Sequence, residues 1–255
     1  MKLIDLHVHT TSSDGTFSPK QVINYALKTK MKAVAITDHN TVLGIDKALK
    51  YAKQKTNLEV VPGIELCCRE DSLGLGDIHV LGLFINHRDK LFLDALKKQQ
   101  NPSHYLFRVM KIFLKKTIFA NLLTKIAAIL RKHSKDALKK PKLSLRETIS
   151  LIKGAGGIVI LAHPGIIKIK KLKKIIEAFI LYGGEGLEAN YPYDRICLMK
   201  KNKSDRINKL IKKIALEKHL AISGGSDFHG YGRKIRIGDE GITEEEFKKL
   251  KLKVR

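Results

Sequence analysis

Cysteine is scarce in this chain, which has only Cys67, Cys68 and Cys197 among its 255 residues. Three cysteines at these positions are too few and too unevenly spaced for the disulfide framework of a small secreted protein. Proteins with so little use for disulfides are typical of a reducing compartment. We therefore expect a cytoplasmic protein.

Long apolar runs are also missing. The longest run, residues 118–130, has thirteen residues and contains Lys125, whereas a membrane-spanning helix needs about 20 apolar residues. The opening segment MKLIDLHVHT lacks the apolar core of a signal peptide. We expect no membrane partner, and no feature of the sequence indicates a protein partner.

Acidic residues are few for a chain of this size. The sequence has 49 Lys and Arg against 25 Asp and Glu, which gives a net charge of +24. Such an excess favours a polyanionic partner such as a nucleotide or RNA. An alternative is a Lys-rich composition that reflects genome base bias, because only ten of the 49 basic residues are arginine.

Short β-branched runs alternate with longer amphipathic stretches, which predicts an α/β protein with a parallel sheet, either open or closed into a barrel. Ser18 and Pro19 supply an N-cap and a first helical residue. We predict strands at residues 2–6, 33–37, 58–61, 78–84, 157–161, 186–189 and 220–223. We predict helices at residues 18–30, 41–53, 145–153, 169–182 and 204–218.

One region breaks the alternation. Residues 101–142 contain eleven Lys or Arg and one acid, Asp136, so this segment has a net charge of +10. Its apolar residues recur at helical spacing. We predict a small basic helical insertion here, within a barrel domain made of residues 1–100 and 143–255. The insertion is interpreted either as a solvated outer face or as a cap that attracts substrate phosphates.

Histidine and carboxylate side chains follow most of the predicted strands. His7 and His9 point to the same side, because residues i and i+2 of a strand share a face, and two such imidazoles suit a transition metal. The carboxyl ends of strands in α/β barrels form the face that carries active sites. The further candidates at or beside strand ends are Asp14, His39, Glu65, His79, His163, Asp227 and His229.

His79 fits this arrangement less well than the others, because it precedes the apolar run of its strand. The other four histidines lie among Lys and Arg on predicted helical segments, and we interpret them as surface residues: His87, His104, His133 and His219.

These motifs together resemble the PHP (polymerase and histidinol phosphatase) family. The resemblance covers residues 3–83 and 145–238, and it is closest to a bacterial subfamily that removes the 3′-phosphate from nucleoside 3′,5′-bisphosphates. Some members of that subfamily also trim RNA from its 5′ end. The shared motifs are His7-x-His9, Ser12-Ser13-Asp14-Gly15, Thr37-Asp38-His39, Pro62-Gly63-Ile64-Glu65, Ala162-His163-Pro164 and Gly225-Ser226-Asp227-Phe228-His229.

The resemblance implies a distorted (β/α)7 barrel of the TIM-like type that holds two to three divalent metal ions, namely Mn, Fe or Zn. It implies that His7, His9, Glu65 and Asp227 hold the first ion, that Asp14, His39 and His229 hold the second, and that Glu65, His79 and His163 hold the third. It further implies a phosphoric ester hydrolase that uses a metal-bridged hydroxide. The catalytic residues would be Asp14, His39, His163 and His229.

The ligand chemistry is coherent on its own terms. Six imidazoles and three carboxylates suit Mn, Fe or Zn, and ions that outweigh three carboxylates would leave a cationic site for phosphate oxygens. The sequence offers no G-x-S-x-G elbow and no Walker loop. Cys67 and Cys68 follow Glu65 closely, so a thiol contact is conceivable, but we interpret them as core or loop residues.

Several neighbouring residues have open roles. Asp5 and Asp38 adjoin candidate histidines and could orient an imidazole, although Asp38 is also placed to cap a helix. Glu188 and Asn190 end the sixth strand and are expected at the mouth of the site. The arginines nearest to the motifs are Arg69, Arg195 and Arg233.

The leading hypothesis is a phosphoesterase for phosphorylated nucleotides or short RNA. One alternative is a phosphatase for a non-nucleotide phosphomonoester such as histidinol phosphate. Another is a catalytically silent barrel that binds nucleic acid, against which the complete set of nine ligand-type residues argues.

Overall fold

The computed structural model describes residues 3–55, 57–99, 143–231 and 234–254. The predicted basic insertion at residues 101–142 lies outside the described residues, so its helical structure and its role stay predictions. Among the residues described, no helix combines the length and the apolar character needed to cross a bilayer.

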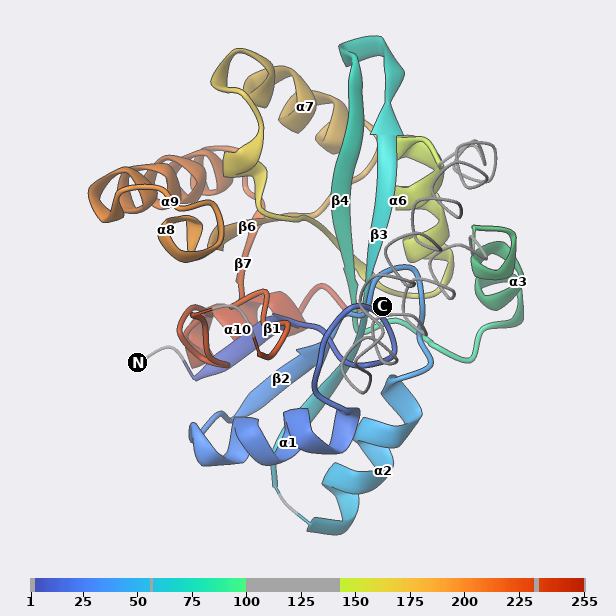
Figure 1. Ribbon diagram of the computed structural model, residues 1–255. Helices are drawn as coiled ribbons and strands as arrows, with labels where there is room; N and C mark the ends of the chain where they lie inside the picture. Colours follow the sequence, from blue (N-terminus) through green and yellow to red (C-terminus); the bar gives the residue numbers. More distant parts are fainter. Residues whose placement is uncertain (1–2, 56, 100–142, 232–233, 255) are drawn as a thin grey trace, which may run out of the picture.

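Seven strands form one sheet in which each strand pairs with its neighbour in the sequence. At the open side, Val8 forms a bridge with Phe228, and the amide of His9 donates to the Phe228 carbonyl at 2.9 Å. The sheet is thereby nearly closed, which confirms the predicted distorted seven-stranded barrel (Figure 1). The strands are β1 Ile4–Val8, β2 Ala33–Ile36, β3 Glu59–Glu70, β4 Leu75–Leu83, β5 Ile158–Leu161, β6 Gly186–Asn190 and β7 Ala221–Gly224.

The direction of β4 differs from the prediction of a wholly parallel sheet. β4 runs antiparallel to both β3 and β5, whereas the other paired strands are parallel. The short 3-10 turn Asp71–Leu73, which Gly74 ends in the left-handed region at φ 58°, returns the chain directly into β4. A parallel connection would need a crossover of a dozen or more residues. Figure 1 shows β3 and β4 extending together beyond the other strands.

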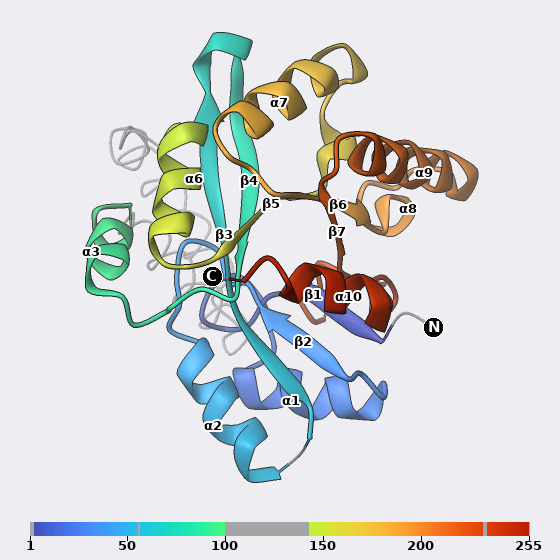
Figure 2. The ribbon, with the colours of Figure 1, turned by 180° about the vertical axis from the view of Figure 1, so that it is seen from behind.

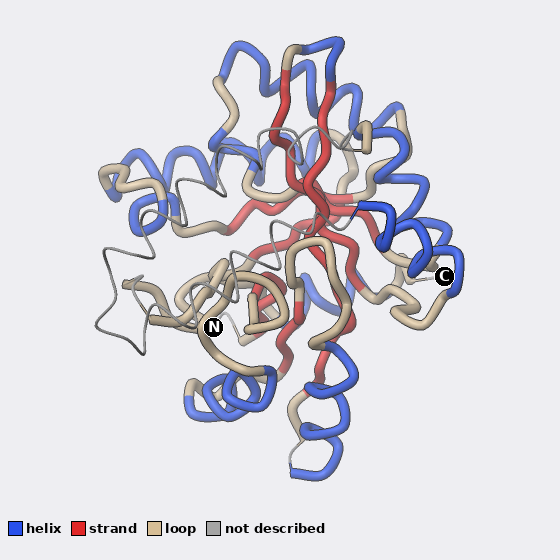
Figure 3. Tube along the Cα trace, turned by 45° about the vertical axis from the view of Figure 1, so that its right-hand side comes forward, coloured by secondary structure: helices blue, strands red, loops and turns tan. Residues whose placement is uncertain are grey.

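The helices surround the strands, as Figures 2 and 3 show. All five predicted helices are present, although α2 begins at Ile45, four residues later than the sequence indicated. Three further helices, α3, α8 and α10, were not predicted. The helices are α1 Pro19–Lys28, α2 Ile45–Lys55, α3 Lys90–Gln99, α6 Leu145–Gly154, α7 Ile169–Leu181, α8 Tyr193–Ile196, α9 Lys201–Glu217 and α10 Glu244–Lys251, with a second 3-10 turn at Pro164–Ile166.

Polar side chains define where several helices begin. Ser18 accepts a hydrogen bond from the amide of Gln21, and Gln21 in turn accepts one from the amide of Ser18. This capping box satisfies amide groups that the first turn of a helix leaves unpaired. The same arrangement opens α6 at Ser144 and α10 at Thr243.

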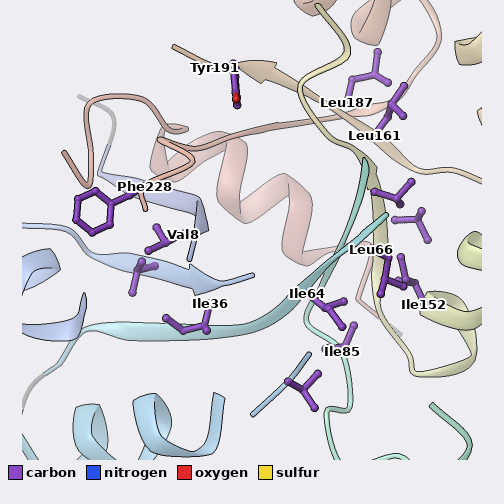
Figure 4. Packing of buried hydrophobic residues seen from close by; sticks show 14 of the residues in the cluster. Val8, Ile36, Ile64, Leu66, Ile85, Ile152, Leu161, Leu187, Tyr191 and Phe228 are labelled. Atoms are coloured by element: carbon purple, nitrogen blue, oxygen red, sulfur yellow. The ribbon is translucent and has the colours of Figure 1, made fainter. Parts of the chain in front are cut away.

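The buried apolar residues form two layers on opposite faces of the strands. Val34 and Ile36 belong to the layer that also contains the inner faces of α1, α2, α6 and α7. Ala33 and Ala35, which alternate with them along β2, belong to a smaller layer that α10 completes with its own apolar side chains. Figure 4 shows part of the larger layer, including Val8, Leu187 and Phe228. The two apolar layers pack against both faces of the strands and so hold the strands in place relative to one another.

Gly225 permits a close approach between the loop after β7 and strand β1. A Cβ atom at this position would lie 2.4 Å from the Cβ of His7 and 2.5 Å from its backbone nitrogen. Neither atom can move without shifting β1. The absence of a side chain at Gly225 therefore sets the position of His7 relative to the loop after β7.

We predict that Gly225→Ala lowers the free energy of unfolding by about 1–3 kcal/mol, the usual cost of overpacking a filled region. Chemical denaturation of the full chain measures this change. Gly154→Ala is the matched control, because its added Cβ meets no atom within 4 Å and alanine favours a helix. Equal stability of the two variants would contradict the close approach.

Candidate metal centre

The structure brings the nine candidate residues together at one end of the barrel. Their ligand atoms fall into overlapping groups, and within each group all of these atoms lie within 4.8 Å of one another. We refer to the nine residues as the polar cluster. Its groups are His7, His9, Glu65 and Asp227; His9, Asp14, His39 and His229; and Glu65, His79 and His163.

Glu65 occupies the centre of the polar cluster and is only 1% exposed. Its Oε2 atom lies 3.1–3.2 Å from imidazole nitrogens of His7, His9 and His39. Its Oε1 atom lies 2.8 Å from His79 Nδ1 and 3.1 Å from His163 Nε2. One carboxylate thus faces five imidazoles from four different segments of the chain.

Backbone pairing continues beyond the end of β2 and holds His39 beside Glu65. These two residues form a parallel bridge, and the amide of Asn40 donates to the Glu65 carbonyl at 2.9 Å. The amide of Glu65 in turn donates to the carbonyl of Asp38 at 3.3 Å. The segment Thr37–Asn40 is therefore fixed to the middle of β3.

The first group has the spacing of a coordination shell. His7 Nε2 and His9 Nε2 are 3.1 Å apart, and they lie 3.5 Å and 3.2 Å from Asp227 Oδ1. Bonds of about 2.1 Å to one ion place neighbouring donor atoms about 3.0–3.4 Å apart in octahedral or tetrahedral geometry. The donor atoms of this group are separated by 3.1–3.5 Å, close to that range.

Asp14 brings the second group to the surface. Its Oδ2 atom lies 3.2 Å from His229 Nε2 and its Oδ1 atom lies 3.6 Å from His9 Nδ1. The Asp14 side chain is 44% exposed, whereas those of His9 and His229 are buried. His9 thus presents Nε2 to the first group and Nδ1 to the second.

The antiparallel direction of β4 explains the position of His79. Because β4 enters the barrel at the end where β3 leaves it, the first half of β4 lies beside the carboxyl ends of the parallel strands. His79 pairs in register with Cys67, and its ring lies 5.1 Å from that of His163, centroid to centroid. His79 precedes the apolar run of its strand in the sequence. In an antiparallel β4, that position lies at the end of the barrel that carries the polar cluster.

Charges in the polar cluster shift the pKa values of its members in opposite directions. Burial lowers the pKa of His9, but its contacts with the carboxylates of Asp227 and Glu65 outweigh burial and raise this pKa to about 9. Burial also works against protonated His79, yet the charge of Glu65 raises its pKa to about 11. Burial raises the pKa of Glu65, and the surrounding imidazoles lower it well below its usual range. Cationic charge thus stabilises the buried carboxylates, and metal ions supply such charge when they displace protons.

The donor set fits divalent metal ions. The Oε2 atom of Glu65 is buried and receives no hydrogen bond of satisfactory geometry from the described residues, although three imidazole nitrogens surround it. Nitrogen and carboxylate donors of this kind suit Zn, Fe or Mn. A cation in contact with Oε2 would satisfy this buried atom.

Glu188 contacts two members of the polar cluster, His7 and His163, from the buried side of the site. Its Oε1 atom lies 2.9 Å from His7 Nδ1, and its Oε2 atom accepts a hydrogen bond of 2.7 Å from the backbone amide of His163. Glu188 is fully buried, so the expectation that it faces the open mouth is wrong. A carboxylate on the second nitrogen of a ligating imidazole fixes the ring and its tautomer.

Asp5 and Asp38 hold backbone segments instead of imidazoles. Asp5 accepts hydrogen bonds from the amides of His7, Ser226 and Gly238, and burial raises its pKa to about 6. Asp38 accepts from the amide and hydroxyl of Thr10 and from the hydroxyl of Ser13. Neither proposed role for Asp38, helix capping or contact with an imidazole, matches these bonds.

A tyrosine that the sequence analysis did not single out supports Asp227. The Tyr191 hydroxyl donates to Asp227 Oδ2 at 2.8 Å, which leaves Oδ1 facing His7 and His9. Asp227 and His163 adopt φ values of 51° and 29°, a region that non-glycine residues rarely occupy. Tyr191 directly follows β6, and its position after a strand is the signal that could have identified it.

The remaining histidines divide between described and undescribed parts of the chain. His87 pairs with Asp46 at 2.9 Å, and His219 follows the last turn of α9. Neither belongs to the polar cluster. His219 is exposed, which confirms its interpretation as a surface residue, whereas His87 lies in a turn with only 13% of its side chain exposed, so that interpretation is wrong for His87. His104 and His133 lie outside the described residues.

Cys67 lies closer to the polar cluster than the sequence analysis expected. Its Sγ atom is 3.4 Å from His79 Nε2 and 3.8 Å from His39 Nδ1. Burial raises the pKa of this thiol, but hydrogen bonds with His39 and His79 outweigh burial and lower the pKa to about 6. Its interpretation as a core or loop residue is wrong. The signal was present, since Cys67 follows Glu65 by two residues on one strand.

Curated relatives match the chain over nearly its whole length. The 5′-3′ exoribonuclease Rnm of Escherichia coli is 27% identical over 95% of this chain and 93% of its own length. The 3′,5′-nucleoside bisphosphate phosphatase of Chromobacterium violaceum is 26% identical over 96% of this chain and 93% of its own length.

Solved structures share the fold. A protein from Bifidobacterium adolescentis described as a metal-dependent phosphoesterase superposes with a TM-score of 0.70 at 22% identity, over 99% of this chain and 96% of its own. An amidohydrolase from Chromobacterium violaceum gives a TM-score of 0.71 at 23% identity, over 99% and 97% of the two chains. The PHP domain family matches residues 5–215. This chain therefore belongs to the PHP domain family, and it is a phosphoric ester hydrolase.

Proposed function

We propose that this enzyme hydrolyses phosphate esters of nucleotides, either the 3′-phosphate of nucleoside 3′,5′-bisphosphates or the phosphodiesters of short RNA. The observation that carries this proposal is the polar cluster, in which nine ligand-type side chains converge at one mouth. Relatives named for both activities match almost the full chain. The net charge of +24 suits an anionic substrate.

We assign two to three divalent ions, Mn, Fe or Zn, to the groups of the polar cluster. When bound, such ions polarise phosphate oxygens and lower the pKa of water. The proposed ligands of the first ion are His7, His9, Glu65 and Asp227; those of the second are Asp14, His39 and His229; and those of the third are Glu65, His79 and His163.

Some side chains of the polar cluster are buried, whereas others are accessible to a substrate. His7, His9 and Glu65 are buried and hold charge in place. Asp14 and His39 are accessible, with 44% and 20% of their side chains exposed, so they face incoming substrate. The proposed catalytic residues are Asp14, His39, His163 and His229.

A cavity of about 490 Å³ beside the polar cluster supports a nucleotide as substrate. It lies against the same loops, because Phe17 follows Asp14 by three residues and Phe228 and Gly230 flank His229. The rings of Phe17 and Tyr231 are 4.9 Å apart, and those of Phe17 and Phe228 are 5.2 Å apart and perpendicular. Phe228 is buried, whereas Tyr231 is exposed, and an exposed aromatic ring stacks on nucleobases in a sequence-tolerant way.

Cationic side chains line the outer part of the same cavity, namely Arg195, Lys234 and Arg236. Arg195 and Arg236 both pair with Asp239, which holds their guanidinium groups in one place. Guanidinium groups bind phosphates through fixed pairs of donors. Of the other two arginines near the motifs, Arg69 pairs with Asp71 at 3.2 Å, and Arg233 lies outside the described residues.

The cavity favours a nucleotide over a small non-nucleotide phosphomonoester such as histidinol phosphate. Aromatic rings combined with cations match a base joined to several phosphates, whereas a single phosphomonoester needs no such surface. A silent nucleic-acid-binding barrel would have no use for the buried ligand-type side chains of the polar cluster, whose burial is costly without compensating charge.

A phosphate-release screen tests the proposal directly. With Mn²⁺ supplied, we expect the fastest turnover on a nucleoside 3′,5′-bisphosphate or a short 5′-phosphorylated RNA, and slower turnover on histidinol phosphate and simple mononucleotides. Protein stripped of metal by a chelator serves as the blank. Preferential turnover of histidinol phosphate would contradict the nucleotide assignment, and no turnover of any ester would contradict catalysis.

The second prediction concerns Tyr231, whose ring is 73% exposed at the rim of the cavity. Loss of one base–aromatic stack costs about 1–3 kcal/mol, so Tyr231→Ala should raise KM for a nucleotide about 5- to 150-fold. KM for p-nitrophenyl phosphate, which has no base, should remain within about twofold if the ring acts only on the base. Leu181→Ala, which removes an exposed apolar side chain at the end of α7, is the control. Equal effects on both substrates would disprove a base-stacking role.

The third prediction separates chemistry from folding at Asp14. Asp14→Asn keeps the shape of an accessible turn residue but replaces a charged donor with a neutral amide. We expect kcat to fall by about 10²–10³-fold, as when one charge-stabilising group is removed from an active site. Unfolding free energy should change by no more than about 0.5 kcal/mol.

Steady-state kinetics and denaturant titration of the same preparations provide the two readouts. Asp205→Asn, an exposed carboxylate of α9 paired with Lys201, is the control and should match the parent enzyme in both. Wild-type turnover by Asp14→Asn at full metal content would remove Asp14 from the catalytic set.

A further inference from the structure

We infer that Cys67 joins His39 and His79 in a nitrogen–sulfur site that binds a thiophilic divalent ion at the rim of the polar cluster. The inference rests on the proposed metal centre and extends it by a donor of a different chemical class. The donor atoms of these three residues lie within 4.8 Å of one another.

The backbone fixes Cys67 from two sides. In the β3–β4 pairing, Cys67 lies opposite His79, so the two side chains leave neighbouring strands at the same level. The amide of Cys67 donates to Asn40 Oδ1 at 3.2 Å, which ties it to the segment that carries His39. The thiol is therefore held between both imidazoles by the fold itself.

The distances match those of ligands around one ion. Zn–N bonds of about 2.0–2.1 Å and a Zn–S bond of about 2.3 Å place nitrogen and sulfur about 3.6 Å apart at a tetrahedral angle. Cys67 Sγ lies 3.4 Å from His79 Nε2 and 3.8 Å from His39 Nδ1, on either side of that value. A hydrogen bond between the thiol and an imidazole is the other use of such a contact.

His79 can serve this site because it presents a separate nitrogen to it. Nδ1 faces Glu65 at 2.8 Å, whereas Nε2 faces Cys67. The side chains of His39 and His79 are 20% and 24% exposed, so the ion would also be accessible from the mouth. Three protein ligands with one accessible position are typical of catalytic zinc sites.

The sulfur donor has a consequence for metal choice. Thiolates favour Zn²⁺ and Fe²⁺, whereas carboxylates and water suit Mn²⁺ and Mg²⁺. The nine residues of the polar cluster supply only nitrogen and oxygen. Cys67 should therefore raise the affinity for Zn²⁺ while leaving the affinity for Mn²⁺ almost unchanged.

Cobalt spectroscopy of the full chain tests this inference without relying on activity. Metal-free protein is titrated with Co²⁺, and a thiolate ligand is recognised by a sulfur-to-cobalt charge-transfer band in the near ultraviolet. We expect this band in the wild type and its loss in Cys67→Ser, with Cys67→Ala as a second variant. Cys68→Ala and Cys197→Ser are matched controls that should keep the band, because Cys68 is buried in the apolar layer and Cys197 follows α8.

Metal competition supplies the second readout. Cys67→Ser should bind Zn²⁺ at least about tenfold more weakly, the lower end of losses reported when even an outer contact of a metal site is removed. Its Mn²⁺ affinity should stay within about twofold, since sulfur contributes little to the binding of that ion. Circular dichroism checks that each variant is folded.

The outcomes separate this inference from the proposed function. If Co²⁺ binds and the band is absent, or persists in Cys67→Ser, the thiol only hydrogen-bonds to the imidazoles and the inference is wrong, while the metal centre stands. If the wild type binds neither Co²⁺ nor Zn²⁺, the metal centre itself is wrong. Loss of the band in Cys67→Ser, with the band kept in Cys68→Ala and Cys197→Ser, supports the inference.

Discussion

The burial of the Glu65 carboxylate is the constraint on which the rest of the site depends. An isolated charge in the interior is costly, and Glu65 is 1% exposed. The chain compensates by bringing five imidazoles within 3.2 Å of its two oxygens. Those imidazoles come from β1, from the segment after β2, from β4 and from the segment after β5, so the barrel must bring four parts of the chain together at one residue.

The antiparallel β3–β4 pair makes this convergence possible. β3 continues past Glu65 to Glu70 instead of ending at the mouth, and β4 returns beside it. His79 consequently approaches Glu65 from the neighbouring strand. The thiol of Cys67 lies between the imidazoles of His79 and His39. In a wholly parallel barrel, His79 would lie at the opposite end of its strand and the third group would lack an imidazole.

Sequence periodicity predicted much of the fold but could not give the direction of β4. All seven strands and five helices were identified, because alternation and capping residues are local signals. Strand direction depends on the connection between strands, and the polar and glycine residues around the turn at residues 71–74 are equally compatible with a longer loop. The short helix α8 and the Lys- and Glu-rich α10 have too little apolar periodicity to be recognised locally, although α10 contributes Phe247 and Leu250 to a buried layer.

The candidate site was more predictable than the contacts that support it. Histidine and carboxylate motifs at strand ends indicated all nine members of the polar cluster, since these residue types are unusual in such positions. The partners of Glu188, Asp5 and Asp38 depend on contacts between segments up to 233 residues apart, which no local pattern encodes. Cys67 lies beyond residue 61, where the third predicted strand ends, so the sequence pattern does not place its side chain on the same face as that of Glu65, whereas β3 extends to Glu70.

Two kinds of charge therefore act at different ranges in this enzyme. The excess of 24 positive charges produces a long-range field that attracts any polyanion and is screened by salt within about 10 Å at 0.1 M. The polar cluster acts only at contact, where the positions of donor atoms decide which ions bind. Neither of these distinguishes one phosphate ester from another. Under the proposed function, discrimination between esters comes from the aromatic and cationic cavity beside the polar cluster, which contacts the part of the substrate that does not react.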